Sequence, residues 1–219
     1  MEIEDLRKEL VLCNNNCEGI KKNLKEGIIP RCMNLEKRNG KNNSIVVGHN
    51  PGKCKKEEKE YYLKNNLSPD SVQTFFEESE LKQKPYFKRT RDLITKLGFE
   101  GDILWTDLAK CECSGKNGIL PIQTLRVCIN KFLRKEINIF KSQVIFALGN
   151  KAFNFCALSF PDHFIVGLYH PSGSYGDFHR LKNDVFNNTR KYVDLLSKRK
   201  DTKENIIAIH LSKFIEKKK

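Results

Sequence analysis

The segment Ser44-Ile45-Val46-Val47-Gly48-His49-Asn50-Pro51-Gly52-Lys53 decides the predicted fold. It begins as a short run rich in β-branched residues, which favour strands. The run stops at Gly-His-Asn-Pro-Gly, because proline has no amide hydrogen for a strand ladder and glycine adopts backbone angles that other residues avoid. A parallel strand that ends in such a turn directs its last residues to the carboxyl edge of the sheet, where open α/β sheets bind ligands. Taken alone, the turn is also compatible with a connection between two elements that has no function of its own.

The composition is that of a soluble globular protein with a heavily charged surface. The chain has 219 residues, of which 39% are hydrophobic and 31% charged. Its length suits one sizeable core, so we predict a single domain over residues 1–219, with a basic C-terminal tail from about residue 200. No apolar run is long enough to span a bilayer, and the acidic segment Met1–Leu6 is unlike a signal peptide. We therefore expect a cytoplasmic, non-secreted monomer that does not bind membranes.

The charge balance and the cysteines narrow the function. Forty Lys and Arg against 27 Asp and Glu give a formal net charge of +13, which favours a polyanionic partner, most often nucleic acid. The alternative is a lysine-rich composition that only aids solubility. Eight cysteines are many for an intracellular chain of this length. In a reducing compartment they are expected to be metal ligands, catalytic thiols or buried core residues rather than disulfides.

Predicted strands and helices alternate along the chain. The expected strands are 44–48, 102–108, 143–149 and 164–168, and the expected helices are 3–12, 53–66, one that begins at Ser68, 86–97, 121–139, 150–158 and 181–197. This alternation implies parallel strand pairing. We predict a three-layer α/β/α sandwich with a central, mostly parallel four-stranded sheet.

Three predicted strand ends carry polar side chains. His49 and Asn50 follow the first strand, Asp107 ends the second, and His170 with Ser172 follows the fourth. In a doubly wound sheet such ends meet at one edge, so we expect these groups to converge. The simpler alternatives are a structural histidine at His170 and a helix cap at Asp107.

These residues carry a resemblance. Gly48-His49-Asn50-Pro51-Gly52 and His170-Pro171-Ser172-Gly173 resemble the two signature motifs of the uracil-DNA glycosylase superfamily. The first motif is closest to the Gly-x-Asn-Pro-Gly form of the mismatch-specific thymine/uracil enzymes, and the second has the His-Pro-Ser form of other branches. Thr106–Cys111, with Cys128 before Val144–Gly149, is similar to the iron–sulfur, family 4-like branch. The resemblance runs from about Cys13 to Ser174.

The resemblance implies a monofunctional DNA glycosylase that acts on a flipped-out base in single- or double-stranded DNA and leaves an abasic site. Asn50 matches the position that holds the attacking water, and His170 matches the donor to an oxygen of the leaving base. The remaining matched positions are base contacts from the backbone around Gly48 and His49, and phosphate contacts near Gly52 and Ser172. Two alternatives remain: a non-catalytic or covalently trapping DNA-binding member of the same fold, and an unrelated nucleotide-binding α/β protein.

Asp107 departs from the family 4-like pattern, which has asparagine at this position. An amide reads both the N3 donor and the O4 acceptor of uracil, whereas an ionised carboxylate only accepts hydrogen bonds. Carboxylates suit the amino group of cytosine. We therefore expect a cytosine derivative or another amino-bearing base. A protonated Asp107 in a desolvated pocket would restore uracil as the substrate.

No motif identifies the aromatic residues that would contact DNA. Tyr61 and Tyr62 follow the first motif at a suitable distance to stack on the base, and Tyr62 is our candidate. Both tyrosines are equally compatible with the core of a helix. Tyr175 or Phe178, just after the second motif, is the candidate wedge that fills the gap left in the duplex.

Four cysteines match the cluster ligands of the family 4-like branch: Cys13, Cys17, Cys111 and Cys128. The resemblance implies a structural [4Fe–4S] cluster, with no cofactor needed for the chemistry. The first pair has three intervening residues where that branch has two. Thiolates suit iron–sulfur or zinc, so zinc and unligated thiols remain alternatives. Of the other cysteines, Cys156 is expected in the core and Cys32 is the reserve ligand.

Overall fold

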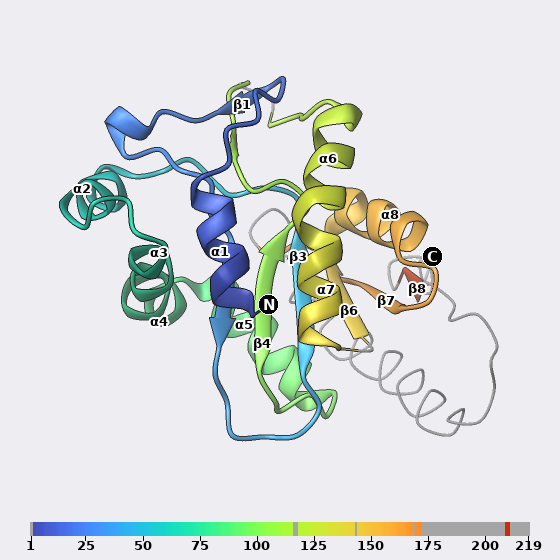
Figure 1. Ribbon diagram of the computed structural model, residues 1–219. Coiled ribbons are helices and arrows are strands. Elements are labelled where there is room, and N and C mark those ends of the chain that lie inside the picture. The colour runs from blue at the N-terminus through green and yellow to red at the C-terminus, as the bar shows by residue number, and fades with distance from the viewer. Residues whose placement is uncertain (1, 116–117, 143, 169, 172–208, 211–219) are drawn as a thin grey trace, which may run out of the picture. The chain divides into compact units, whose positions relative to one another are not determined.

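A computed structural model describes residues 2–115, 118–142, 144–168, 170–171 and 209–210 (Figure 1). It confirms the α/β class, with helices flanking a central, mostly parallel sheet. Several predicted features lie outside the described residues: Ser172, Tyr175, Phe178, the helix expected at 181–197 and most of the basic tail.

The predicted elements agree closely with the observed ones. The strands are β1 Ile20–Lys21, β2 Met33–Glu36, β3 Ser44–Gly48, β4 Ile103–Asp107, β5 Glu112–Cys113, β6 Val144–Leu148, β7 Phe164–Leu168 and β8 Ile209–His210. The α-helices are α1 Ile3–Val11, α2 Lys56–Lys64, α3 Pro69–Phe75, α4 Leu81–Gln83, α5 Pro85–Lys96, α6 Ile122–Cys128, α7 Arg134–Phe140 and α8 Gly149–Ser159. A 3-10 helix, η1 Leu24–Glu26, and two π-helical segments, η2 Phe76–Glu80 and η3 Ile129–Leu133, complete the set. The helix predicted at Ser68 begins there, since the Ser68 hydroxyl accepts the Ser71 amide at 3.2 Å.

The strand order of the larger sheet is β2-β4-β3-β6-β7-β8. The pairs β3–β6, β6–β7 and β7–β8 are parallel, with Val46 opposite Phe146 and Phe146 opposite Val166. The prediction of four strands was therefore short by β2 and the two-residue β8. β2 escaped prediction because it is only four residues long and two of its buried residues, Asn34 and Glu36, are polar.

The chain divides into two compact units. The first comprises Met1–Glu36, Gly48–Gln83 and Leu104–Lys141, and the second comprises Lys37–Val47, Lys84–Ile103 and Ser142–Lys219. The boundaries cut through β3 and β4, and the Gly48–Gly52 loop begins next to the one in β3. The prediction of one domain over 1–219 stays a prediction. Within the described residues, no helix has the length and apolarity that crossing a membrane requires.

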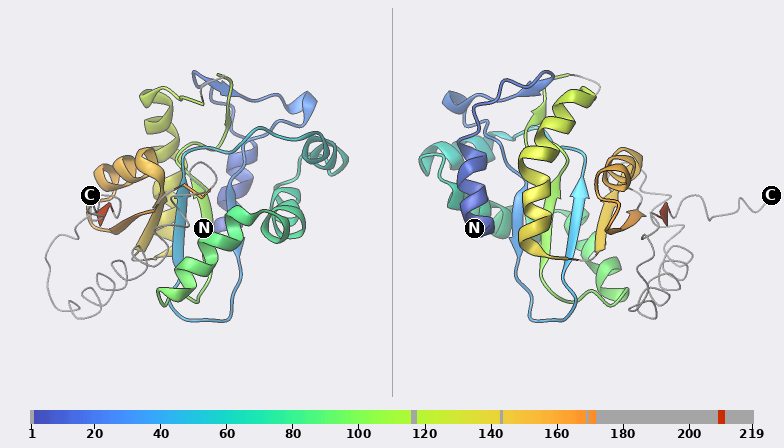
Figure 2. Two further views of the ribbon diagram at one scale, coloured as in Figure 1. Left: turned by 180° about the vertical axis from the view of Figure 1, so that it is seen from behind. Right: turned by 45° about the vertical axis from the view of Figure 1, so that its right-hand side comes forward.

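Each unit has its own packing. In the first, α1 packs against α7 and α3, and Trp105 of β4 donates its indole N–H to Glu36 of β2 at 2.9 Å. In the second, α8 packs on β6 and β7, and Phe99 packs edge-on against Phe146 of β6 at 5.3 Å between ring centroids. Figure 2, left, shows α5, which ends just before Phe99, in front of β3. Cys156 of α8 is fully buried, as predicted.

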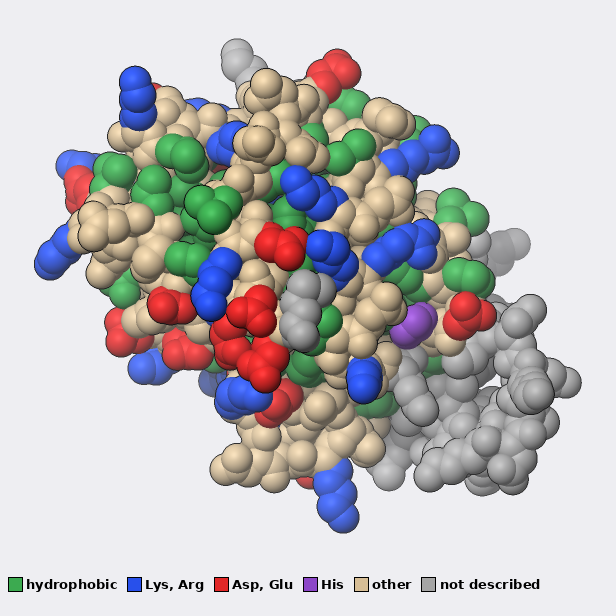
Figure 3. Space-filling model, viewed as in Figure 1, with side chains coloured by type: hydrophobic (Ala, Val, Ile, Leu, Met, Phe, Trp, Pro, Cys, Tyr) green, Lys and Arg blue, Asp and Glu red, His purple; other side chains and the backbone are tan. Residues whose placement is uncertain are grey.

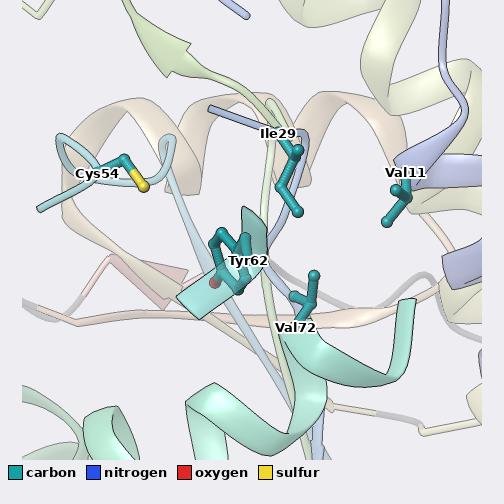
Figure 4. Close-up of a cluster of buried hydrophobic side chains, with 5 residues drawn as sticks. All are labelled: Val11, Ile29, Cys54, Tyr62 and Val72. Atoms are coloured by element: carbon teal, nitrogen blue, oxygen red, sulfur yellow. The ribbon is translucent and has the colours of Figure 1, made fainter. Parts of the chain in front are cut away.

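Tyr62 of α2 lies in a hydrophobic cluster of the first unit. Figure 4 shows its ring among the other four members of this cluster, Val11, Ile29, Cys54 and Val72. The Tyr62 side chain is 2% exposed, and its hydroxyl donates to Glu58 at 3.2 Å. Because its faces are covered by core residues, the core alternative describes Tyr62 in this structure, not the base-stacking one.

This packing predicts how Tyr62 variants behave. Tyr62→Ala should lower the free energy of unfolding by about 3–5 kcal/mol, because it removes a buried aromatic ring. Tyr62→Phe keeps the packing and loses one hydrogen bond, so it should cost only about 1 kcal/mol. Denaturant unfolding measures both. If Tyr62→Ala were as stable as wild type but bound DNA weakly, Tyr62 would be an exposed stacking residue after all.

Candidate functional site

The loop Gly48–Gly52 is anchored at its start by the turn that follows β4. The Leu108 amide donates to the Gly48 carbonyl at 3.0 Å, and the Ala109 amide donates to the His49 carbonyl at 3.1 Å. The first strand end and the turn after Asp107 therefore form one hydrogen-bonded unit. This much of the predicted convergence is present within the first unit.

The loop is anchored a second time at its last residue, Gly52, and at Cys54 two residues further on. The Arg31 guanidinium donates to the Gly52 carbonyl at 2.5 Å, and the Cys54 amide donates to the Glu112 carboxylate at 2.6 Å. Arg31 is itself tied to the same turn, since its backbone amide donates to the Lys110 carbonyl at 2.7 Å. Sequence reasoning missed Arg31 and Glu112, because nothing local distinguishes them from surface charges.

Asn50 lies between these anchors. Its side chain is half-buried, and its amide nitrogen donates to the Pro51 carbonyl at 2.9 Å. Gly52 is exposed, and a Cβ placed there would meet nothing within 4 Å. The loop thus presents a partly accessible carboxamide followed by open space beside Gly52.

Asp107 is buried at the end of β4, with a side chain that hydrogen-bonds with the Cys32 thiol. Burial raises the pKa of Asp107 to about 7, against the opposing effects of the Cys32 hydrogen bond and of the cations Lys110 and Arg31. Glu136 adds to the upward shift. Near neutral pH this carboxyl group is therefore divided between its acid and carboxylate forms.

A buried ion pair supports the Asp107 turn. Lys110 Nζ lies 2.6 Å from Glu136 Oε1, and the two side chains are 1% and 0% exposed. Lys110 also donates to the Asp107 carbonyl at 2.9 Å, and the Thr106 hydroxyl contacts both Lys110 and Glu136. A lysine in so basic a chain is expected on the surface, so only the structure reveals this role.

His170 belongs to the second unit. Its ring contacts Tyr86 with 5.6 Å between centroids, and burial lowers the pKa of His170 below its usual 6.5. The imidazole is therefore mostly neutral at pH 7, with one nitrogen carrying a proton. Gly149, with φ +83°, lies close by, and a Cβ there would come within 3.7 Å of the His170 Cβ.

The four cysteines of the predicted cluster line a single pocket in the first unit. Its lining also includes Lys22, Lys110 and Lys131. All eight cysteines of the chain are free thiols. Cys32 does not line the pocket, so the structure does not support it as a reserve ligand. Its thiol instead hydrogen-bonds with Asp107, and its carbonyl accepts from Thr106 at 3.1 Å.

The donor set of this pocket fits a thiolate-bound cluster. Burial, reinforced by the neighbouring thiols, raises the pKa of Cys111 to about 12, and burial raises the pKa of Cys128 to about 11. The Lys110 amide points to Cys128 Sγ at 3.3 Å, and Lys131 Nζ lies 3.7 Å from Cys13 Sγ. Thiols in this setting lose their protons when a bound iron or zinc centre compensates the charge. In the described part of the chain, no three His, Cys, Asp or Glu side chains are grouped as ligands of a single ion.

The raised pKa of Asp107 gives a prediction about stability. Between pH 4 and pH 7 the folded protein binds more protons at this carboxyl than the unfolded chain does, so wild-type stability falls as the pH rises through this window. Asp107→Asn has no ionisable group at this position, so its stability should not fall in this way as the pH rises. At about pH 8 the variant should be more stable than wild type by up to about 4 kcal/mol, with the difference shrinking toward pH 4. Urea unfolding across this range measures it. The exposed Asp92→Asn is the matched control, and an equal gain in that variant would contradict the assignment.

Comparison with known proteins assigns the family. A sequence model described as the uracil DNA glycosylase superfamily matches residues 39–194, which is well over half of the chain. No curated protein matches the chain. The matched range contains Gly48–Gly52, Asp107 and His170, the residues that carry the resemblance. The protein belongs to the uracil DNA glycosylase superfamily.

Proposed function

We propose that the protein is a monofunctional DNA glycosylase that hydrolyses the N-glycosidic bond of a flipped-out uracil or amino-bearing, cytosine-derived base. Superfamily membership supports a glycosylase activity in general. The observation that carries the specific proposal is the loop Gly48–Gly52, held by backbone hydrogen bonds to the turn after Asp107. This arrangement ties the proposed water-holding residue and the proposed base-reading residue into one unit. A positioned water and a base reader are what the reaction requires.

In this mechanism Asn50 orients a water toward the sugar carbon that bears the base. The water oxygen bonds to that carbon, and the base leaves with the electrons of the broken N-glycosidic bond. The proton lost by the water is taken up by the departing base or by solvent, because an amide is a poor general base. From its match to the second family motif we assign neutral His170 the hydrogen bond to the charge that develops on the base, a contribution of about 3–4 kcal/mol in comparable sites.

Asp107 is the proposed reader of the base. As an acid it donates a hydrogen bond to O4 of uracil, and as a carboxylate it accepts one from an exocyclic amino group. Because burial brings its pKa to about 7, both forms are present near neutral pH. Aspartate in place of asparagine is therefore compatible with two substrate classes: uracil at lower pH, and an amino-bearing base at higher pH.

DNA is the proposed partner. The formal net charge of +13 supports a polyanionic ligand. Four exposed lysines follow the Gly48–Gly52 loop, namely Lys53, Lys55, Lys56 and Lys64. In Figure 3, Lys and Arg side chains are spread over the face shown, and the carboxylates gather mainly in its lower left part. This pattern suits diffuse contact with backbone phosphates rather than a single anion site. We propose Gly52 as the point of closest approach, since its exposed side leaves room for a phosphate.

We further propose that Cys13, Cys17, Cys111 and Cys128 hold a [4Fe–4S] cluster, as in the family 4-like branch. The common pocket and the Lys110 amide directed at Cys128 support this assignment. A single zinc would need all its ligands within about 2.3 Å of one point, whereas a cluster binds one cysteine per iron and spreads the sulfurs apart. When bound, the cluster would supply structure rather than chemistry. It would hold the chain around Cys111, next to the Asp107 turn.

A panel of oligonucleotides tests the function. Each carries one uracil, one modified cytosine or one hypoxanthine, and abasic-site formation is scored at about pH 6.5 and about pH 8. We expect wild type to remove uracil faster at the lower pH and the cytosine derivative faster at the higher pH. Asp107→Asn should remove uracil equally at both. Asn50→Ala should lose at least about 100-fold in rate without unfolding.

The outcomes of this panel separate the possibilities. If wild type removes uracil efficiently and Asp107→Asn leaves this activity unchanged at both pH values, Asp107 does not read the base. A covalent protein–DNA adduct in place of free base would indicate the trapping member of the fold. No DNA binding at low salt would favour a nucleotide-binding protein instead.

The cluster has its own test. Protein purified without oxygen should be brown and contain about four iron and four acid-labile sulfide per chain. Cys111→Ser and Cys128→Ser should lose most of this content, whereas Cys156→Ala, in the core of the second unit, should keep it. A colourless protein with one zinc per chain would show that the chain binds zinc instead of an iron–sulfur cluster.

A further inference from the structure

We propose that Arg31 is the positioning residue of the Gly48–Gly52 loop, acting on the reaction through the placement of Asn50. This inference rests on the proposed function and adds a residue that no motif contains. Among the described residues no hydrogen bond joins Arg31 to the side chain of Asp107 or of Asn50, and its charge acts on Asp107 only at longer range. Its effect is transmitted through the main chain at Gly52.

The guanidinium of Arg31 makes contacts in three directions. Its Nη2 donates to the Gly52 carbonyl at 2.5 Å and lies 3.5 Å from Glu112 Oε2, while its Nε lies 2.8 Å from Glu58 Oε1. These partners come from the loop, from β5 and from α2. The planar fork of arginine serves several acceptors at fixed angles, whereas the point charge of lysine does not.

The two carboxylates bind more than Arg31. Glu112 also accepts the Cys54 amide at 2.6 Å, and Glu58 also accepts the Tyr62 hydroxyl at 3.2 Å. The pair of Arg31 and Glu112 thus holds the carbonyl of Gly52 and the amide of Cys54, the main-chain groups on either side of Lys53. One main-chain acceptor and one main-chain donor are therefore held at the end of the loop.

Burial makes this arrangement rigid. The side chains of Arg31, Glu58 and Glu112 are only 7%, 6% and 4% exposed. A buried charge that loses its partner is strongly destabilised, so these groups have few alternative positions. The guanidinium is also too deeply buried to contact a phosphate. Its role toward DNA is therefore indirect.

The consequence for Asn50 follows from where the anchors lie. Gly48 and His49 are bonded to Leu108 and Ala109 on one side, and Gly52 is bonded to Arg31 on the other. Asn50 has one residue, Pro51, between it and the second anchor. A displacement of about 1 Å at a positioned group costs on the order of 100-fold in rate. Loss of the second anchor should therefore lower the chemical rate more than DNA affinity.

Arg7 provides a matched control in the same unit. Its side chain is also buried, with Nε donating to the Met33 carbonyl at 2.9 Å and Nη2 donating to Gln73 at 2.7 Å. Like Arg31, it bonds one main-chain carbonyl, but its side-chain partner is a single amide where Arg31 has two carboxylates, and its hydrogen bonds do not reach the loop. Arg7→Lys should therefore cost stability without moving Asn50.

The experiment compares Arg31→Lys with Arg7→Lys. Single-turnover base release is measured on the uracil and modified-cytosine oligonucleotides of the panel, together with DNA affinity and amide hydrogen exchange. Arg31→Lys should release base at least about 10-fold more slowly, with Kd within about 3-fold of wild type. The Cys54 amide should exchange faster than in Arg7→Lys. Arg7→Lys should keep its rate within about 3-fold.

Several results would overturn the proposal. One is a folded Arg31→Lys with the wild-type rate, and another is an equal rate loss in both variants at equal thermal stability. A loss confined to DNA affinity would instead make Arg31 a DNA contact. If Arg31→Lys does not fold, Glu58→Gln weakens the same anchor, and it should give a smaller rate loss and faster Cys54 exchange. Absence of base release by wild type would reject the proposed function alone. The hydrogen-exchange data would still test whether Arg31 anchors the loop, since unchanged protection of the Cys54 amide in Arg31→Lys would exclude that role.

Discussion

The buried guanidinium of Arg31 joins the parts of the first unit that would otherwise be separate loops. It binds the carbonyl that ends the Gly48–Gly52 loop, it pairs with carboxylates from α2 and β5, and its own amide bonds to the turn after Asp107. A charge removed from water must be matched by partners of fixed geometry. The requirement to satisfy Arg31 therefore fixes the path of three segments at once.

A second buried pair does the same for the turn itself. Lys110 and Glu136 are almost completely buried, and Lys110 holds the Asp107 carbonyl. Asp107 is thereby surrounded by charges of both signs, and burial outweighs the cations in setting its pKa. The side chain is rigid in position but variable in protonation. That combination suits recognition of a hydrogen-bonding edge, and it costs stability whenever the carboxyl is ionised.

Lys110 also links this turn to the cysteine pocket. Lys110 is one of the residues that line the pocket, its side chain supports Asp107, and its backbone amide points to the Cys128 sulfur. A group held by the four cysteines would therefore bear directly on the segment that carries Asp107. This proximity would give the proposed structural centre a role beside a proposed site whose chemistry does not need it.

The order of the elements was predictable from the sequence, because the four main strands are short runs buried at every position and the helices repeat apolar residues about every 3.6 positions. The four main strands and most described helices were found in this way, as was the loop that carries Asn50. The resemblance to the family 4-like branch led to the four cysteines that share the pocket. The strand β2 was missed because its buried polar residues, such as Glu36, depend on partners far away in the chain.

What only the tertiary structure decided is which charged and aromatic side chains are buried. Arg31, Lys110 and Glu136 resemble ordinary surface charges in the sequence, and Tyr62 was compatible with stacking on a base. Their roles follow from partners that the chain brings together across dozens of residues. The sequence by itself determined the family motifs and the alternation of strands and helices, because these depend on neighbouring residues. The anchoring of the loop and the pKa of Asp107 depend on desolvation and on distant charges, which exist only once the chain is folded.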